Sequence, residues 1–173
     1  KLWYKNPFFR AAAAVILVAG TSVATYLMVN NKMTIRELYS DNYSPLTLDV
    51  IERSGNFVSD SITAGFIAYQ EARYADCIKI LGSLAVPDSV AAPVYLVRGL
   101  AYLEQEKAAK AQEQLSLAAK DTTSGVVDHA RWYLALSYLA TNQPEKAKYW
   151  LDLLVKEDAT YKEKAIQLLN QMK

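Results

Sequence analysis

The side chains that most often carry out chemistry are scarce in this sequence, because Cys77 is the only cysteine and His129 the only histidine. One of each cannot build an ordinary zinc site, and a single cysteine excludes an internal disulfide bond. His129 could act as a general base, but it follows Asp128 at the start of a predicted helix, where a carboxylate is sufficient as a helix cap. We therefore expect no metal and no cofactor.

The polar residues match no catalytic motif. The sequence has no Ser–His–Asp spacing, no glycine-rich phosphate loop and no HExxH motif. The net charge is only +1 and no basic stripe is present, so there is no overall electrostatic reason to bind nucleic acid. The missing motifs predict a protein that is not an enzyme.

A pattern of small and bulky residues recurs along the chain at the length of a helix pair. Three aligned sets, each with members 34 and then 36 residues apart, are Gly65, Gly99 and Ala135; Cys77, Ala111 and Ala147; and Leu81, Leu115 and Leu151. Small residues at this period predict stacked helix pairs, and stacked helix pairs usually bind other proteins. Cys77 therefore falls at a packing position.

Turn and cap residues divide the region after residue 58 into helices. The predicted helices cover residues 62–72, 74–85, 94–105, 108–119, 129–141, 145–155 and about 159–172, the last covering the open end of the third pair. Pro93 suits a first helical turn, where its missing N–H costs nothing. Asp128 is expected to cap the helix that follows it, and Asn142 to end that helix.

These residues resemble the tetratricopeptide repeat family, which has a small residue where the first helix of a pair crosses the second and an aromatic residue three positions later. Tyr102 and Tyr138 match the aromatic position, whereas Ala68 departs from it. The resemblance covers residues 59–173 and implies an all-α fold: an α-solenoid of about three helix pairs with a C-terminal capping helix. The layout is also similar to a group of bacterial membrane proteins with one span before a short repeat domain.

In this repeat class the first helix of each pair lines the concave face. The positions that the resemblance places in such a groove are Ile62, Phe66, Tyr69, Leu96, Leu100, Leu103, Trp132, Leu136 and Leu139, with Glu104 and His129 at the rim. A groove this apolar is suited to an apolar segment, either of a partner or of the chain's own linker, with Trp132 and Tyr69 as central contacts. Alternatively, three tightly coiled repeats bury these residues as core.

A long uncharged run near the N-terminus predicts a transmembrane helix over residues 8–29. No charged residue occurs from Ala11 to Asn31, and the nineteen residues to Val29 would span roughly 28 Å as a helix, close to the thickness of a bilayer core. Lipid would surround this segment. A cleaved signal peptide and a buried helix are the competing interpretations, and the length of the run favours a permanent anchor.

The flanking charges predict the orientation of this anchor. Lys1, Lys5 and Arg10 precede the run with no acidic residue among them, which favours a cytoplasmic flank over residues 1–7 and a repeat domain on the periplasmic side of the inner membrane. Residues 30–58 are predicted as a juxtamembrane linker with a short amphipathic helix over residues 34–43. Its apolar residues could lie on the membrane surface or on the first repeat.

Two functions follow from this organisation. The first is a membrane-anchored interaction or scaffold subunit of a bacterial envelope complex, whose partners are other membrane-complex subunits. The second is a transmembrane regulator, since some members of the similar group carry an anti-sigma-like cytoplasmic part ahead of the span. Such a part would lie outside this chain.

Overall fold

The computed structural model describes residues 21–22, 33–47 and 59–173, and the chain divides into two compact units, Lys1–Met33 and Thr34–Lys173. In those ranges no helix is both long enough and apolar enough to cross a bilayer. The predicted flank over residues 1–7 lies outside the described residues, as does the predicted span over residues 8–29 apart from Thr21 and Ser22.

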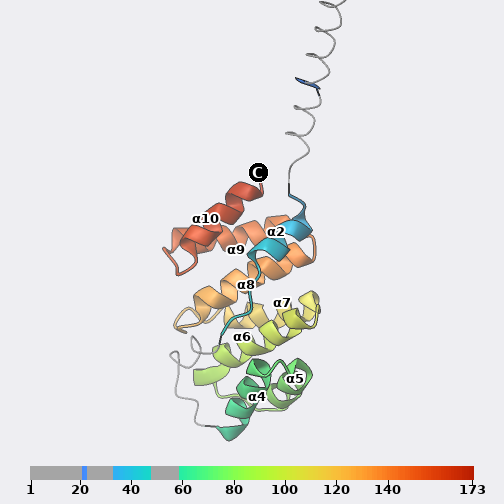
Figure 1. The fold of residues 1–173 in the computed structure, drawn as a ribbon. Coiled ribbons are helices and arrows are strands. Elements are labelled where there is room, and N and C mark those ends of the chain that lie inside the picture. Colours follow the sequence, from blue (N-terminus) through green and yellow to red (C-terminus); the bar gives the residue numbers. More distant parts are fainter. Residues whose placement is uncertain (1–20, 23–32, 48–58) are drawn as a thin grey trace, which may run out of the picture. The chain divides into compact units, whose positions relative to one another are not determined.

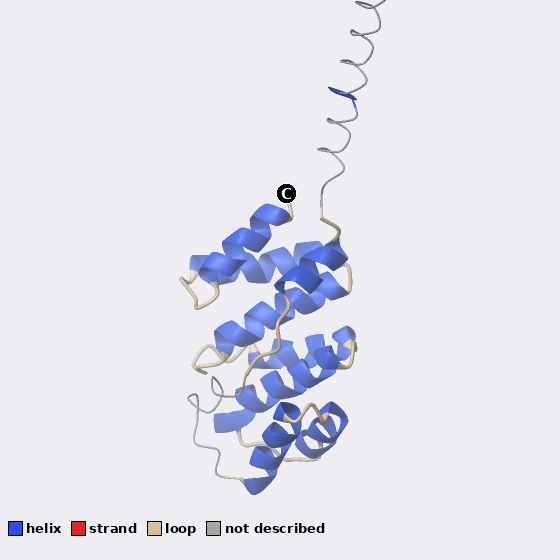
Figure 2. Cartoon of the chain, viewed as in Figure 1, coloured by secondary structure: helices blue, strands red, loops and turns tan. Residues whose placement is uncertain are grey.

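The second unit is all-helical in its described part (Figure 2). Its helices are α2 (Ile35–Asn42), α4 (Asp60–Gln70), α5 (Tyr74–Gly82), α6 (Asp88–Glu104), α7 (Ala108–Ala118), α8 (Val127–Ala140), α9 (Pro144–Lys156) and α10 (Lys162–Gln171). Helices α4 and α5, α6 and α7, and α8 and α9 pack as pairs, and the pairs stack in chain order with α10 against α9 (Figure 1). The prediction of an all-α fold with stacked helix pairs is therefore confirmed for these residues.

Small residues stand where the helices of a pair cross, as the 34-residue period predicts. A Cβ atom added to Gly65 would lie 2.3 Å from Leu81 Cδ2, and one added to Gly99 would lie 2.6 Å from Leu115 Cγ. Both leucines are fully buried. Glycine is therefore required at these crossings because a leucine of the partner helix fills the space.

Cys77 lies in the same packed layer. Its side chain is fully buried, and burial raises the pKa of the thiol to about 12 although Arg98 acts in the opposite direction. The thiol therefore stays protonated near neutral pH and behaves as a small apolar side chain.

Each pair turns through a residue in the left-handed conformation. Ala72, Glu106 and Asn142 have φ angles of 56°, 58° and 56°, and Asp158 follows α9 with a φ of 53°. In each turn this residue donates its N–H to a carbonyl three residues back, and the next residue donates to a carbonyl five residues before itself. This is the Schellman arrangement, which satisfies the last carbonyls of a helix.

Several helix boundaries differ from the prediction. Helix α6 begins at Asp88, so Pro93 lies inside the helix; the hydrogen bond it cannot make would end on the carbonyl of Ser89, an exposed residue that water can reach. Helix α8 begins at Val127, so Asp128 lies in its first turn rather than at its cap. Its carboxylate instead accepts a hydrogen bond of 2.8 Å from the backbone N–H of Thr160, which ties α8 to the turn before α10.

Candidate functional site

The first helices of the three pairs carry all of the residues predicted to line a groove. Ile62, Phe66, Tyr69, Leu96, Leu100, Leu103, Trp132, Leu136 and Leu139 come from α4, α6 and α8, and none is more than 5% exposed. They form a continuous apolar layer that is covered in the structure. We refer to this side of α4, α6 and α8 as the inner face.

Residues 34–47, which we call the N-terminal segment, supply part of that cover. Helix α2 packs against α8 and α10, and Leu38 is only 1% exposed. Leu46, four residues beyond the helix, is 9% exposed. The boundary between the two compact units therefore falls inside the predicted linker of residues 30–58, and α2 lies on the third helix pair rather than on the first.

Local sequence determines the shape of the N-terminal segment. Thr34 and Glu37 form a capping box, with the Thr34 hydroxyl accepting from the N–H of Glu37 at 3.2 Å and the Glu37 carboxylate accepting from the N–H of Thr34 at 2.6 Å. Tyr43 has extended backbone angles and ends α2. Pro45 then follows, and a residue before proline also avoids the helical conformation. The segment is thus two helical turns followed by extended chain.

Two tyrosine hydroxyl groups join the N-terminal segment to the inner face. The hydroxyl of Tyr43 donates to Glu104 Oε1 at 2.5 Å, and the hydroxyl of Tyr133 donates to the carbonyl oxygen of Ser44 at 2.7 Å. The rings of Tyr43 and Tyr133 also meet edge to face, with centroids 6.0 Å apart. These contacts connect residues 61 and 89 positions apart in the chain, so they hold the segment at a defined position.

Glu104 bonds to one phenol group and acts electrostatically on four others. The tyrosine cluster, as we define it, consists of Tyr39, Tyr43, Tyr69, Tyr74 and Tyr133, and the Glu104 carboxylate contributes to raising the pKa of each of them. Burial is the largest cause of the raised pKa in every case. The phenols therefore stay protonated through the physiological range and can act as hydrogen-bond donors.

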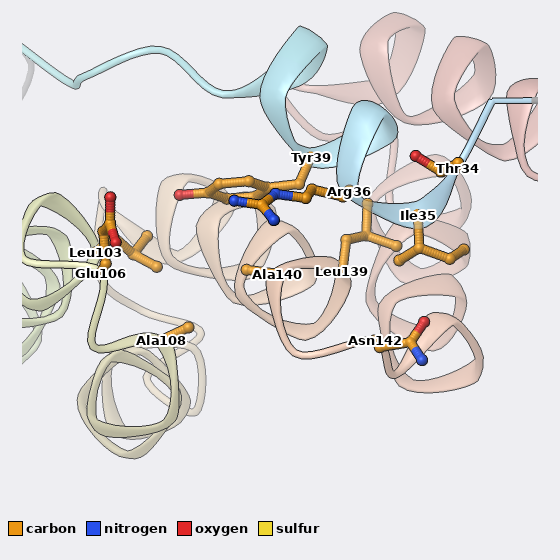
Figure 3. A pocket seen from close by; sticks show the side chains of 10 residues that line it. All are labelled: Thr34, Ile35, Arg36, Tyr39, Leu103, Glu106, Ala108, Leu139, Ala140 and Asn142. Atoms are coloured by element: carbon orange, nitrogen blue, oxygen red, sulfur yellow. The ribbon is translucent and has the colours of Figure 1, made fainter.

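Open space remains beside α2. A cavity of about 600 Å³ lies between α2, the turn after α6 and the end of α8 (Figure 3). In Figure 3 the side chains of Arg36 and Tyr39 extend from α2 over Ala140 toward Leu103 and Glu106. A second cavity of about 400 Å³ lies between Ile35 and the helices α9 and α10. The N-terminal segment therefore covers the inner face without filling it.

Trp132, predicted as a central contact, is covered by the chain itself. Its ring stacks on Tyr161 with centroids 5.1 Å apart and an interplanar angle of 9°. Tyr161 also contacts His129, whose Nδ1 lies 2.8 Å from the Tyr161 hydroxyl. Burial lowers the pKa of His129, although the Asp128 carboxylate acts in the opposite direction. The third helix pair is thus closed by the residue just before α10.

Sequence reasoning missed Tyr43 and Tyr133 as residues of this site, and it placed Glu104 only at the rim. The signal for Tyr43 was its position directly before Ser44-Pro45, where the predicted helix has to end. Tyr133 gave no signal of its own, because its neighbours on the same helix are equally apolar or aromatic. Tyr69, predicted as the second central contact, does lie in the tyrosine cluster.

The geometry defines a class of structure, an all-helical stack of helix pairs whose inner face is covered by a preceding segment of the same chain. No protein-family model, curated protein or solved structure matches this chain significantly.

Proposed function

We propose that this protein is a membrane-anchored interaction subunit of a bacterial envelope complex, built on tetratricopeptide-like repeats, whose inner face binds a short segment of a partner protein. The observation that carries the proposal is the position of the N-terminal segment. Its buried Leu38 and Leu46, and the hydrogen bonds of Tyr43 and Tyr133, indicate the kind of peptide that suits this surface. A partner would present two helical turns followed by extended chain.

The contacts of the N-terminal segment are those of a peptide ligand. Helix-in-groove recognition uses a few apolar anchors at helical spacing, with polar groups fixing the register. Leu38 is the helical anchor, Leu46 the anchor of the extended part, and the Tyr133 hydroxyl binds the backbone at Ser44. A backbone contact of this kind does not depend on side-chain identity, so a partner segment of different sequence can make it.

The cavities beside α2 favour exchange of the segment. Hollows of about 600 and 400 Å³, both partly open to solvent, lie on the two sides of Ile35, so α2 leaves accessible surface on both of its sides. A partner helix with larger side chains would fill these spaces and compete with α2.

Membrane anchoring is the second part of the proposal, and the uncharged run from Ala11 to Asn31 supports it. Only two residues separate this run from the capping box that begins at Thr34. With the N-terminus in the cytoplasm, the helix pairs would lie on the periplasmic side. An anchor so close to the N-terminal segment would bring the inner face near partners that are themselves in the membrane.

Site-specific photocrosslinking in native membranes tests the proposal. A photoreactive residue at Ala140, which is exposed and lines the larger cavity, should crosslink to another protein. The substitution Leu38→Asp should increase this crosslink, because a carboxylate cannot occupy the buried position of Leu38 and α2 should leave the inner face. A photoreactive residue at Lys79, exposed on α5, is the control position.

The substitution control is Leu117→Asp, which makes the same chemical change at an exposed leucine of α7. It should leave the crosslink at Ala140 unchanged. The proposal would be contradicted if Ala140 crosslinks only within its own chain in both the unaltered protein and the Leu38→Asp variant.

A further inference from the structure

Among the described residues, the carboxylate of Glu104 bonds to a phenol and to no basic side chain. Glu104 is half-buried at the end of α6, and in residues 33–47 and 59–173 no lysine or arginine forms an ion pair with it. Its observed bonding partner is the neutral Tyr43 hydroxyl. A carboxylate can accept several hydrogen bonds, and the strongest come from charged donors.

Tyrosines of α2, α4, α5 and α8 lie near this carboxylate: the Tyr43 hydroxyl bonds to it, and its charge contributes to raising the pKa of Tyr39, Tyr69, Tyr74 and Tyr133. Tyr69 on α4 and Tyr74 on α5 have ring centroids 5.7 Å apart, and Tyr39 stacks on Tyr43 at 5.3 Å. Tyr133 on α8 meets the edge of Tyr43. Three of these rings, those of Tyr69, Tyr74 and Tyr133, belong to the helix pairs and would remain if the N-terminal segment left.

A carboxylate among tyrosine rings is suited to a cation. The face of an aromatic ring attracts an ammonium or guanidinium group, and a nearby carboxylate neutralises its charge and accepts its hydrogen bonds. We propose that Glu104, with Tyr69, Tyr74 and Tyr133, is a subsite for a lysine or arginine side chain of the bound partner segment. Tyr43 occupies this subsite in the absence of the partner. The inference rests on the function proposed above and specifies the partner's chemistry.

Departure of the N-terminal segment would leave the site more acidic. Arg36, which lines the larger cavity together with Glu106, belongs to α2 and would leave with it. Glu104 and Glu106 belong to α6 and the turn after it and would stay, and the nearby Lys107 ammonium is bonded to the side-chain oxygen of Gln105 at 2.6 Å. The charge left behind favours a basic segment over an acidic or neutral one.

The first test places a cation in the subsite within the full chain. Y43K, Y43M and Y43E are compared in detergent by hydrogen exchange of the backbone amides of residues 38–46. Lysine and methionine are unbranched and of similar length, so Y43M controls for the loss of the ring. The expected result is an opening equilibrium constant at least tenfold smaller for Y43K than for Y43M, with Y43E opening most. The same comparison in an E104Q background should show no difference between Y43K and Y43M.

The result that would overturn the inference is equal exchange in Y43K and Y43M while Glu104 is present. E106Q serves as the matched control, because Glu106 is exposed two residues away and is a secondary charge in this site. If E106Q abolished the difference in opening equilibrium constant between Y43K and Y43M and E104Q did not, the assignment of the subsite to Glu104 would be wrong.

The second test supplies the segment in trans. Fluorescent peptides of residues 34–47, unaltered or with Y43K or Y43M, are titrated by anisotropy into the full-length L38D variant in detergent. The Y43K peptide should bind at least tenfold more tightly than the Y43M peptide, and E104Q in the protein or 0.5 M NaCl should reduce that difference to less than threefold. If all three peptides bind equally, the cation subsite is wrong although the groove stands. If none binds, the proposed function is wrong, and the hydrogen-exchange comparison alone decides whether the subsite exists.

Discussion

The helix crossings and the interface under α2 are two packed regions of the same unit with opposite character. At the crossings, Gly65 and Gly99 admit the fully buried side chains of Leu81 and Leu115. Under α2, apolar anchors alternate with phenol groups and a carboxylate, and cavities remain on both sides of Ile35. The first region is closely packed around leucine side chains, and the second contains polar groups and borders hollows that are open to solvent.

The difference separates what holds the fold together from what can exchange. Close packing at a crossing is stabilised by van der Waals contacts between complementary side chains. If the two helices separate, these contacts are lost and no other group replaces them. Hydrogen bonds under α2 can be replaced by those of water or of another peptide, so their net contribution to folding is small. Because the helix pairs are held by close packing and α2 partly by replaceable hydrogen bonds, the unit can release α2 while its helix pairs stay folded.

Gly99→Val, at a helix crossing, should destabilise the unit more than any change under α2. The added Cβ would lie 2.6 Å from Leu115 Cγ and 3.4 Å from the backbone nitrogen of Leu115, so α6 and α7 would have to separate. We expect a loss of about 3 kcal/mol in the free energy of unfolding, at the upper end of typical overpacking costs. Urea denaturation followed by circular dichroism measures it.

Gly82→Ala is the control for that substitution. Its added Cβ would meet only the Arg98 guanidinium, at 3.8 Å, and alanine favours the helix over glycine by about 0.5 to 1 kcal/mol. Close packing at the crossing therefore predicts that Gly82→Ala is neutral or stabilising. A similar loss in both variants would show that the close contact with Leu115 does not account for the loss at Gly99.

Leu38→Ala should cost about 2 kcal/mol, at the low end for a buried leucine because α2 can detach instead of leaving a cavity. Hydrogen exchange in residues 35–42 should become faster while exchange in α6 and α8 stays slow. Leu117→Ala, at a leucine that is 41% exposed, should change neither the free energy of unfolding nor the hydrogen exchange of residues 35–42. Faster exchange throughout α4–α10 in the Leu38 variant would mean that α2 is part of the cooperative core.

The helix pairs could be predicted from sequence because their determinants are local and repeated. Gly65 and Gly99 recur with the same partners, Leu81 and Leu115, so one period predicts two crossings. The start of α6 was misplaced because proline is usually found at the beginning of a helix, whereas Pro93 lies inside one. Propensity rules describe an isolated helix, and the packing of α6 against α7 overrides them here.

The site was harder to predict because its contacts occur once and join distant residues. The sequence indicated a helix near residues 34–43 and an apolar set on the first helices, and the structure confirms the helix. The pairing of Tyr43 with Glu104 spans 61 residues and follows no period. Only the folded chain shows that the apolar residues are covered and that the polar contacts lie in the tyrosine cluster.

Tyr133→Phe should test the polar contacts under α2 on their own. It removes the hydrogen bond to the carbonyl oxygen of Ser44 and keeps the ring that meets Tyr43. Ser44 is exposed, so water can bond to its carbonyl, and we expect a loss of about 1 kcal/mol. Thermal melting and the exchange of residues 43–46 measure it. No change in that exchange would mean that the Tyr133 hydrogen bond does not help to hold the N-terminal segment.

Glu106→Gly should stabilise the unit, by about 0.5 to 1 kcal/mol, because a left-handed residue with a Cβ costs more than glycine at the same place. Glu106 has a φ of 58° in the turn between α6 and α7. Asn142→Gly is the matched control at the corresponding turn and should change stability less, since asparagine tolerates this conformation. A loss of stability in the glycine variant would indicate that the Glu106 side chain contributes a contact under α2.

The smallest expected effect is a pH dependence from the end of the stack. The folded protein holds the pKa of His129 below its ordinary value of 6.5, so between that lowered pKa and about pH 6.5 the unfolded chain binds more protons than the folded one. Stability should therefore rise with pH through this window and fall on acidification from pH 7.5 to 5.5. His129→Gln should flatten this part of the plot of unfolding free energy against pH, measured by urea denaturation.

Asp128→Asn should steepen the same part of the plot, because it removes the charge that opposes the lowered pKa of His129 while keeping an oxygen for the N–H of Thr160. An unchanged slope in the His129→Gln variant would show that protonation of this histidine is not linked to folding.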